Sequence, residues 1–422
     1  MQIGNYLRRT SLENAPLTAR ETVYLVGFAL IFLAFFLKST LILQWTPLIG
    51  WIIKWGRVAG LGIVLISVFF TKRVSLPILA MMAMAFYFAY VIRYFSSYNM
   101  FYFLALVFCA YGVRGRKIVG TALLETILLV LITVMICAMG DIDNLRYRRE
   151  GLVRQSLGFI YPTDFAAHLT FLAILFGVYK NDHYRVRDGL AIMCMAVFAY
   201  YVCNARLDSI VIALSVVLFM LNAFTFHSKW LRKNVSNLAT VALSIGYPIL
   251  LIGTFYLSIA WQNGSQFADK INHLLSSRIS LVAEALTRYT INWFGQYVSM
   301  SGYGGVAGKN MDRTIYGYFM IDSSMAQLVI MYGIVMAIIT SIIVYVIIFR
   351  TGRKHYLALQ IGLGLVLLHA FVAQFLFNPG YDCILFLAFA NLNYGFDTAF
   401  HERPEYDDLD QLQPNGLLQA IC

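Results

Sequence analysis

Long apolar stretches, separated by short polar segments, run along almost the whole chain. A membrane-spanning helix needs about 20 mostly apolar residues, and most of these stretches approach or exceed that length. The apolar residues follow one another without alternating polar positions, which predicts helices and does not fit a membrane β-barrel. The pattern predicts twelve spans, near residues 22–43, 48–70, 74–91, 97–112, 118–139, 162–180, 188–203, 206–226, 237–261, 321–349, 356–377 and 381–396.

Basic residues in the short polar segments indicate how these helices are oriented. Lys and Arg are enriched in loops that stay in the cytoplasm. They recur in every second loop, at residues 71–73, 114–117, 180–187, 229–233 and 350–354, and Arg8, Arg9 and Arg20 precede the first span. We therefore expect one multi-pass domain over residues 1–396 with both termini in the cytoplasm, and a disordered acidic tail over residues 397–422.

Composition narrows the class of protein further. A hydrophobic fraction of 60% and a charged fraction of 13% over 422 residues exclude an ordinary soluble domain. The net charge of +11 is accounted for by membrane anchoring, so the expected partner is the lipid bilayer and not a nucleic acid. The sequence has no HExxH motif and no Cys/His cluster, so we expect no metal and no other cofactor. The alternative is that Asp141 and Asp143 form a metal-binding Asp-x-Asp pair.

Two loops on the opposite, extracytoplasmic side are longer than the others, at about residues 140–161 and 262–320. Both carry arginines, which the charge rule for orientation does not predict. A loop of such length in a compact membrane protein is more often functional than idle. Arginine kept beside the membrane on this side indicates a site for an anionic, lipid-linked substrate.

The longer of the two loops has a helical pattern of its own. Its apolar stripe consists of Leu275, Ile279, Val282, Leu286 and Tyr289. Such a short amphipathic helix fits the bilayer surface, and in that position it can still carry part of a site. The glycine-rich segment 301–310 follows it, with Tyr303 in its middle, and we interpret this segment as a flexible flap.

Two arginines are candidates for binding phosphate groups. Arg206 stands at the outer end of a span, where a charged group is costly unless it is paired or faces water. Arg278 stands in the first turn of the amphipathic helix, where the helix dipole disfavours a cation unless an anion binds nearby. Guanidinium groups bind phosphate oxygens in a bidentate way. The alternatives are a local contact between Arg206 and Asp208, and a solvated surface role for Arg278.

Three further candidates lie at the junction of the first long loop and the sixth predicted span. Arg154 directly precedes an apolar segment and so must lie near the membrane. Asp164 and His168 follow, one helical turn apart, at the outer end of the span. Ionisable residues at this depth are functional candidates by default, although His168 equally fits a role in packing. Arg146, Arg148 and Arg149 have acidic neighbours, so they can also be a self-paired, solvated group.

Asp322 and several tyrosines complete the candidate residues. Asp322 lies at the start of the tenth predicted span, where it can cap the helix, orient or deprotonate an attacking hydroxyl, or do both. Tyrosines are common at membrane interfaces. Those of the two long loops, Tyr161, Tyr303 and Tyr316 among them, can also stack on sugars.

The order of these segments resembles that of the O-antigen ligase and polymerase superfamily, and of its Wzy-type polymerases in particular. The segments are Arg154 in RQSLGFIYPTD, Arg206 in NARLDSIVIAL, Arg278 in LLSSRISLVAEAL with INWFGQ after it, and Asp322 before SSMAQLVIMYGIV. The resemblance covers about residues 140–345, and the first third of the chain shares only the hydropathy of the family. Ligase relatives often carry a histidine where this chain has Asp322.

The resemblance implies a metal-independent glycosyltransferase with a GT-C-like, all-α membrane fold. Its substrate would be an oligosaccharide linked to undecaprenyl pyrophosphate, at the outer leaflet of a bacterial plasma membrane. Arg206 and Arg278 would neutralise the departing pyrophosphate, Asp322 would act on the acceptor, and Arg154 would hold substrate. A chain-length regulator and a flippase would be its partners in polysaccharide synthesis.

The sequence therefore favours a polymerase of polysaccharide repeat units. Two alternatives stay open: a flippase or another twelve-span transporter for lipid-linked oligosaccharides, and a ligase that transfers the finished glycan to a different acceptor. Transporters often show paired repeats and charges near the middle of the membrane. Here the charges cluster near one rim and the chain shows no repeat.

Overall fold

The computed structural model describes residues 16–44, 47–70, 82–83, 85, 90, 99–149, 151–225, 228–310 and 317–393. Within these residues, eight helices are long and apolar enough to cross a membrane. Two shorter apolar helices, α5 (Asn99–Cys109) and α16 (Leu357–Val372), pack among them. The chain is therefore an all-α membrane protein at the level of its fold class. The predicted span 74–91 and the acidic tail 397–422 fall almost entirely outside the described residues.

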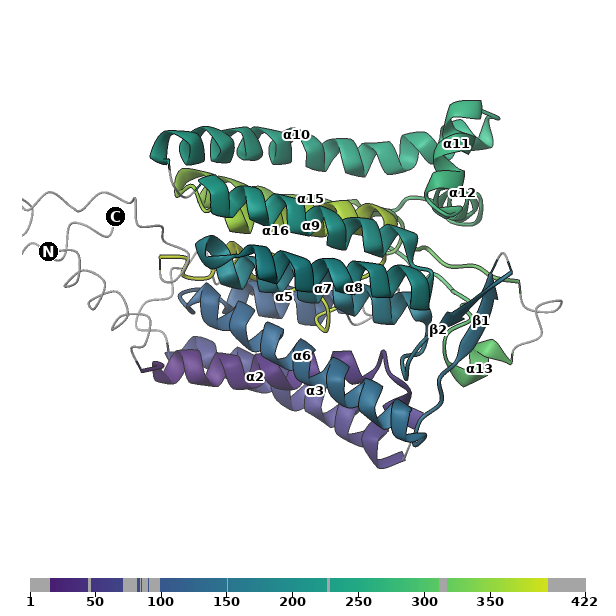
Figure 1. Cartoon of the computed structure of the whole chain (residues 1–422), viewed down its shortest axis with the longest axis horizontal. Helices are drawn as coiled ribbons and strands as arrows, with labels where there is room; N and C mark the ends of the chain where they lie inside the picture. The colour runs from purple at the N-terminus through teal and green to yellow at the C-terminus, as the bar shows by residue number, and fades with distance from the viewer. Residues whose placement is uncertain are drawn as a thin grey trace, which may run out of the picture.

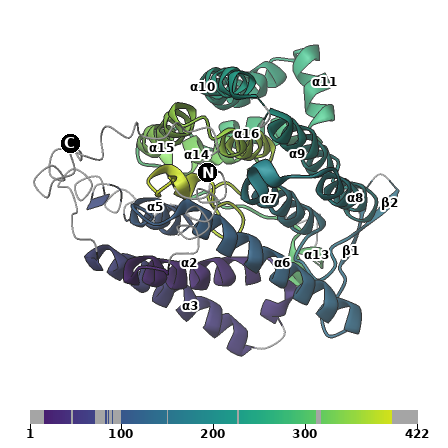
Figure 2. The same ribbon diagram turned by 60° about the vertical axis from the view of Figure 1, so that its left-hand side comes forward.

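The long helices lie side by side and roughly parallel to one direction (Figure 1). They are α2 (Ala19–Leu37), α3 (Pro47–Ser67), α6 (Gly115–Met139), α7 (Pro162–Lys180), α8 (Val186–Cys203), α9 (Arg206–Thr225), α10 (Lys229–Gln262) and α15 (Gly333–Arg353). Figure 2 shows α10 at the edge of this bundle, where it packs on α9, α15 and α16. Helix α7 is the most enclosed of the eight and lies between α6, α8, α9 and α16.

The remaining elements gather mainly at one end of the bundle (Figure 1), which we call the loop-rich end. They are the antiparallel strands β1 (Arg146–Arg149) and β2 (Leu152–Gln155), and the short helices α11 (Gln266–Leu274), α12 (Arg278–Arg288) and α13 (Gly305–Lys309). Short 3₁₀ helices are η1 (Leu41–Gln44), η2 (Val68–Phe70), η3 (Asn181–His183) and η4 (Leu385–Ala388). The predicted loop 262–320 is thus largely folded where it is described.

Local sequence explains where the elements begin. Thr18 and Glu21 form a capping box at the start of α2, which satisfies amide groups that the helix leaves without partners. Helix α12 confirms the predicted amphipathic helix, and its buried residues Ile279 and Val282 face the protein. The Gln262 side chain donates to the Ala283 carbonyl at 2.6 Å, which ties α12 to the end of α10. The protein itself therefore covers the apolar stripe that the sequence assigned to the bilayer surface.

The last predicted span, over residues 381–396, is not a helix in its described part. The chain there is irregular apart from η4, and its side chains are almost all buried. Arg350 of α15 donates to the carbonyls of Ala388 and Ala390 at 2.5 Å and 2.8 Å. Irregular backbone is tolerated at membrane depth where protein surrounds it and satisfies its polar groups. An apolar run alone does not distinguish such a segment from a helix.

The tenth predicted span, over residues 321–349, is broken into α14 (Ser324–Ile330) and α15. The break occurs at Gly333, whose backbone has a φ of +88°, a conformation that glycine adopts without strain. The segment after α12 satisfies the backbone groups that the break exposes. The backbone amide of Gln296 donates to the Met331 backbone carbonyl at 3.0 Å, and the backbone amide of Ile334 donates to the Asn292 backbone carbonyl at 3.1 Å.

Candidate functional site

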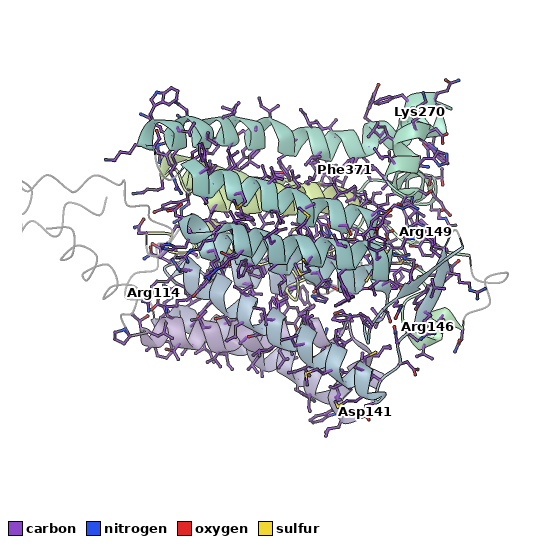
Figure 3. The ribbon with its side chains drawn as sticks, viewed as in Figure 1. Arg114, Asp141, Arg146, Arg149, Lys270 and Phe371 are labelled. Carbon is purple, nitrogen blue, oxygen red and sulfur yellow. The ribbon has the colours of Figure 1, made fainter. Side chains whose placement is uncertain are left out.

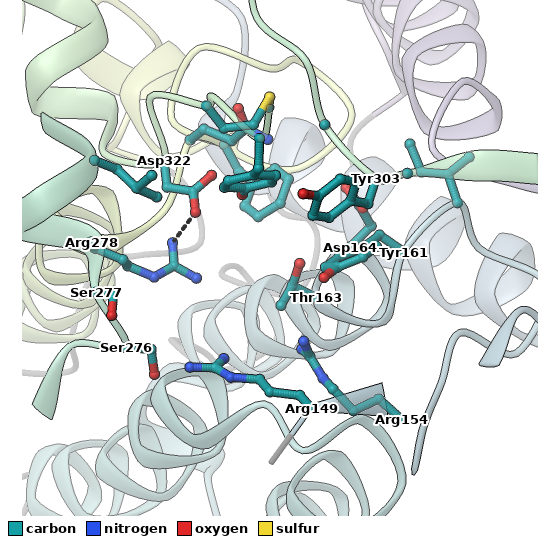
Figure 4. A pocket seen from close by; sticks show the side chains of 18 residues that line it. Arg149, Arg154, Tyr161, Thr163, Asp164, Ser276, Ser277, Arg278, Tyr303 and Asp322 are labelled. Carbon is teal, nitrogen blue, oxygen red and sulfur yellow. Dashed lines mark ion pairs between the residues drawn. The ribbon is translucent and has the colours of Figure 1, made fainter. Parts of the chain in front are cut away.

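A cavity of about 350 Å³ opens at the loop-rich end of the bundle, and we call it the arginine cavity. Six segments surround it: the β1–β2 hairpin, the start of α7, the turn between α11 and α12, the glycine-rich segment near Tyr303, the chain that precedes α14, and the chain that follows α16. Figure 3 shows Arg146 and Arg149 at this end of the molecule and Arg114 at the opposite end. Arg149, Arg154 and Arg278 all line the cavity (Figure 4). Sequence elements far apart in the chain therefore bring three guanidinium groups together.

The turn before α12 positions Arg278. Ser276 and Ser277 both have a left-handed backbone conformation, with φ of 58° and 65°, which residues other than glycine rarely adopt. Strained residues of this kind cluster at functional sites. The turn places Arg278 as the first residue of α12, where its guanidinium donates to the Val372 carbonyl and lies 3.8 Å from the Asp322 carboxylate. The two serines thus bend the chain before α12, and the Ser277 side chain makes no capping hydrogen bond.

Arg154 is almost completely buried, with 3% of its surface exposed. Its Nε donates to the Cys203 carbonyl at 2.8 Å, and its guanidinium carbon lies 5.5 Å from the centre of the Tyr161 ring. Its Nη2 is buried and has no hydrogen-bond partner among the described residues. Burial lowers the pKa of Arg154, yet an arginine keeps its charge in proteins. A buried donor without a partner is costly, and a bound anion would satisfy it.

Two carboxylates, those of Asp164 and Asp322, also line the cavity. Asp322 pairs with Arg278, and its pKa is raised above the ordinary aspartate value because burial outweighs the opposing effects of Arg278 and the Tyr318 hydroxyl. Asp164, in the first turn of α7, accepts a hydrogen bond of 3.2 Å from the Tyr381 hydroxyl. The cavity therefore combines groups that bind an anion with groups that accept a proton.

Tyrosines form the side of the cavity that includes the glycine-rich segment. The rings of Tyr303 and Tyr318 lie 4.8 Å apart between centroids, and burial raises the pKa of Tyr318. The Tyr147 hydroxyl of β1 donates to the Tyr303 carbonyl at 2.9 Å. Gly308 has no room for a side chain, because a β-carbon there would lie 2.7 Å from the Tyr303 carbonyl carbon. The predicted flap is thus attached to the hairpin that carries Arg149 and Arg154.

The structure brings together most, but not all, of the predicted site residues. Arg154, Tyr161, Asp164, Arg278, Tyr303 and Asp322 line the cavity. Arg206 begins α9 with an exposed side chain and does not line it. His168 is fully buried, and its Nε2 lies 2.8 Å from the Ser39 hydroxyl. Tyr316 lies outside the described residues.

Sequence reasoning missed several residues that line the cavity. Arg149 belongs to the arginine group for which a self-paired, solvated role was the alternative, and nothing in the sequence separates it from Arg146 and Arg148. Thr163, Tyr318 and Gln374 carry no pattern that separates them from packing residues. Asp208 is the residue that the sequence offered as a local partner of Arg206. Its Oδ1 lies 3.0 Å from the Nε2 of His369 and accepts a hydrogen bond of 3.3 Å from the Thr170 hydroxyl.

No three His, Cys, Asp or Glu side chains lie together as a metal site among the residues that the structure describes. No family model, curated protein or solved structure matches the chain. The function is therefore inferred from the chemistry of the arginine cavity and its position on a helical membrane protein.

Proposed function

We propose that the protein is a polysaccharide polymerase of the bacterial plasma membrane, with the arginine cavity as its active site. The observation that carries this proposal is the meeting of three guanidinium groups and two carboxylates in one cavity at one end of a bundle of apolar helices. The proposed donor consists of a membrane-embedded lipid, a diphosphate and a glycan, and each of these parts suits a different part of the protein or its surroundings. The lipid fits the bilayer, the diphosphate fits the arginines and the glycan fits the tyrosines.

The arginines would bind the diphosphate of the donor. Arg278 stands at the N-terminus of α12, an eleven-residue helix whose dipole favours an anion. Arg154 offers a buried donor that lacks a partner among the described residues. Because these cations already neutralise a diphosphate, the transfer needs no metal ion to do so.

The reaction follows from the two kinds of charged groups. The hydroxyl oxygen of the acceptor attacks the anomeric carbon of the donor, and the bond from that carbon to the diphosphate oxygen breaks. The electron pair of the broken bond leaves on the diphosphate, where the arginines stabilise the developing charge. The hydroxyl proton passes to Asp322, whose raised pKa suits a proton acceptor.

The loop-rich end would face the outside of the cell. In this orientation the basic loops at residues 114–117, 229–233 and 350–354 lie in the cytoplasm, as the charge rule expects. The arginine cavity then lies at the outer leaflet, where a separate flippase would deliver lipid-linked repeat units. A chain-length regulator would limit the length of the polymer made from them. A transporter would instead place its charged residues near the middle of the helices.

The proposal is tested by polymerisation with purified protein in lipid nanodiscs. The substrate is the lipid-linked repeat unit that accumulates in cells lacking this chain. Wild-type protein is expected to extend it into a ladder of polymers, and Arg278→Ala to reduce the rate about 100- to 1,000-fold, as expected for the loss of one charged group that stabilises the transition state.

The matched control is Arg288→Ala, at the other end of α12. Arg288 is half exposed and paired with Glu284 in the same helix, so its loss should leave the rate nearly unchanged. A wild-type protein that makes no polymer, or equal rates for the two variants, would contradict the proposal. Transfer of one glycan onto a different lipid acceptor, without a ladder, would identify a ligase instead.

A further inference from the structure

A second cavity, of about 220 Å³, adjoins the arginine cavity. Four residues line both: Ile160, Asp164, Gln374 and Phe375. The second cavity extends from this shared wall toward the end of α2, the start of α5 and the break between α14 and α15. The two spaces are thus neighbours with a common boundary, and a molecule in one can approach a molecule in the other.

The chemistry of the second cavity differs from that of the first. Among the described residues no arginine lines it, and its one cation is Lys38. Four side-chain amides line it, those of Asn99, Gln327, Gln374 and Asn378. An amide both donates and accepts hydrogen bonds, as a sugar hydroxyl does. Together with aromatic rings from several segments, this lining suits a sugar and not a diphosphate.

The break between α14 and α15 supports a binding role for this space. Met331 and Tyr332, the residues of the break, line the cavity. Irregular backbone at membrane depth occurs where it is buried in protein or lines a cavity, and broken helices often mark binding sites. The break is held closely, because a β-carbon on Gly295 would lie 2.2 Å from the Met331 carbonyl oxygen. The chain therefore maintains an interruption whose residues border the cavity.

Asp164 occupies the wall between the two cavities and is held from behind. Its partner Tyr381 stacks on His168, with 3.9 Å between ring centroids, and on Phe375, with 4.3 Å. His168 in turn contacts the Ser39 hydroxyl at 2.8 Å. This buried stack fixes the Tyr381 hydroxyl, which donates to the carboxylate of Asp164. The carboxylate is thereby positioned where a hydroxyl in the second cavity would meet the arginine cavity.

We propose that the second cavity binds the terminal sugar of the acceptor glycan, and that Asp164 orients the attacking hydroxyl toward the donor. This inference rests on the proposed function and adds to it a separate acceptor subsite. The arginine cavity then holds the diphosphate and first sugar of the donor. Asp164 accepts a hydrogen bond from a neighbouring hydroxyl of the acceptor sugar and so orients the attacking hydroxyl, whose own proton passes to Asp322 as the new glycosidic bond forms.

The test measures donor and acceptor binding separately in nanodiscs. The donor is the lipid-linked repeat unit from cells lacking this chain, and the acceptor is the same repeat unit after mild acid has removed its lipid diphosphate, with a fluorescent label. Asn99→Ala and Lys38→Ala are each expected to raise the acceptor KM about tenfold, the effect of one lost hydrogen bond. The donor KM should stay within about twofold in both. Arg149→Ala should show the opposite pattern.

Asp164→Asn and Asp164→Ala separate orientation from folding. Asparagine keeps an oxygen that can accept the hydroxyl hydrogen bond, so the Asn variant should keep more activity than the Ala variant. Asn263→Ala, at the exposed end of α10, is the control and should change neither KM. Thermal unfolding of each variant checks that the protein is folded.

The outcomes distinguish the two levels of the proposal. If wild-type protein transfers no glycan to any acceptor, the polymerase function fails and the acceptor subsite fails with it. If wild-type protein is active but the Asn99 and Lys38 variants raise the donor KM, or leave the acceptor KM unchanged, only the acceptor subsite is overturned.

Discussion

Two buried arginines at opposite ends of the bundle are held in different ways. Arg114 pairs with Glu21 through two contacts, Nε to Oε1 at 2.7 Å and Nη2 to Oε2 at 3.0 Å. Arg154, at the loop-rich end, donates a hydrogen bond to the Cys203 carbonyl and has a buried Nη2 without a partner in the described structure. A closed ion pair joins segments of the fold, whereas an incompletely satisfied guanidinium is available to a ligand. Because Arg154 also lines the arginine cavity, its guanidinium can meet a ligand there.

The largest effects are expected when each of these two arginines is replaced by alanine in a separate variant. Arg154→Ala is expected to lower the polymerisation rate about 100-fold, because a charged contact to the diphosphate is lost. Arg114→Ala should instead destabilise the protein by about 3 kcal/mol, because Glu21 is left as an uncompensated buried charge. Thermal unfolding and rate per folded molecule measure the two effects. Equal losses of stability in both variants would remove the distinction between the ends.

The pH dependence of the rate sharpens the comparison at the loop-rich end. Asp322 must be ionised to accept a proton, and burial raises its pKa. Activity should therefore fall as the pH drops through this raised pKa, at a higher pH than for an ordinary aspartate. Arg278→Lys keeps a positive charge but alters its geometry, so the acid limb should move less than in Arg278→Ala, where it shifts to higher pH. An unchanged acid limb in Asp322→Asn would exclude Asp322 as the proton acceptor.

A smaller effect is expected from adding a side chain at the helix break. Gly333→Ala places a β-carbon 2.3 Å from the Gly295 amide nitrogen, in a left-handed backbone, and should cost about 2 kcal/mol of stability. Gly246→Ala, in the unbroken helix α10, has open space around it and should be neutral or slightly stabilising. Thermal unfolding of the two variants measures the difference. Similar stabilities would mean that the break tolerates a side chain.

Hydropathy predicted the class of fold and most of its helices, because apolar length is a property of each segment alone. It did not predict the break at Gly333, which depends on hydrogen bonds to Asn292 and Gln296 from a separate segment. Nor did it predict the irregular chain around η4, which depends on the donors that Arg350 provides. Both departures come from contacts between distant parts of the chain.

The candidate site was predicted in the same uneven way. Arg154, Arg278 and Asp322 stood out because a charge beside an apolar run is costly wherever the run packs. By that criterion Arg206 looked equally good, yet its place on the exposed side of α9 is set by the packing of that helix. Gln374 and Asn99 could not be found at all, since nothing in a single sequence shows that they line one cavity.

The first and last parts of the described chain approach each other closely beside the second cavity. A β-carbon on Gly380 would lie 2.7 Å from the backbone nitrogen of Phe36, so α2 and the segment near Tyr381 are in direct backbone contact. During synthesis on the ribosome, α2 enters the membrane long before this segment has been translated. The wall that both help to form is therefore completed only in a nearly finished polypeptide, and a truncated or stalled chain would lack the assembled second cavity.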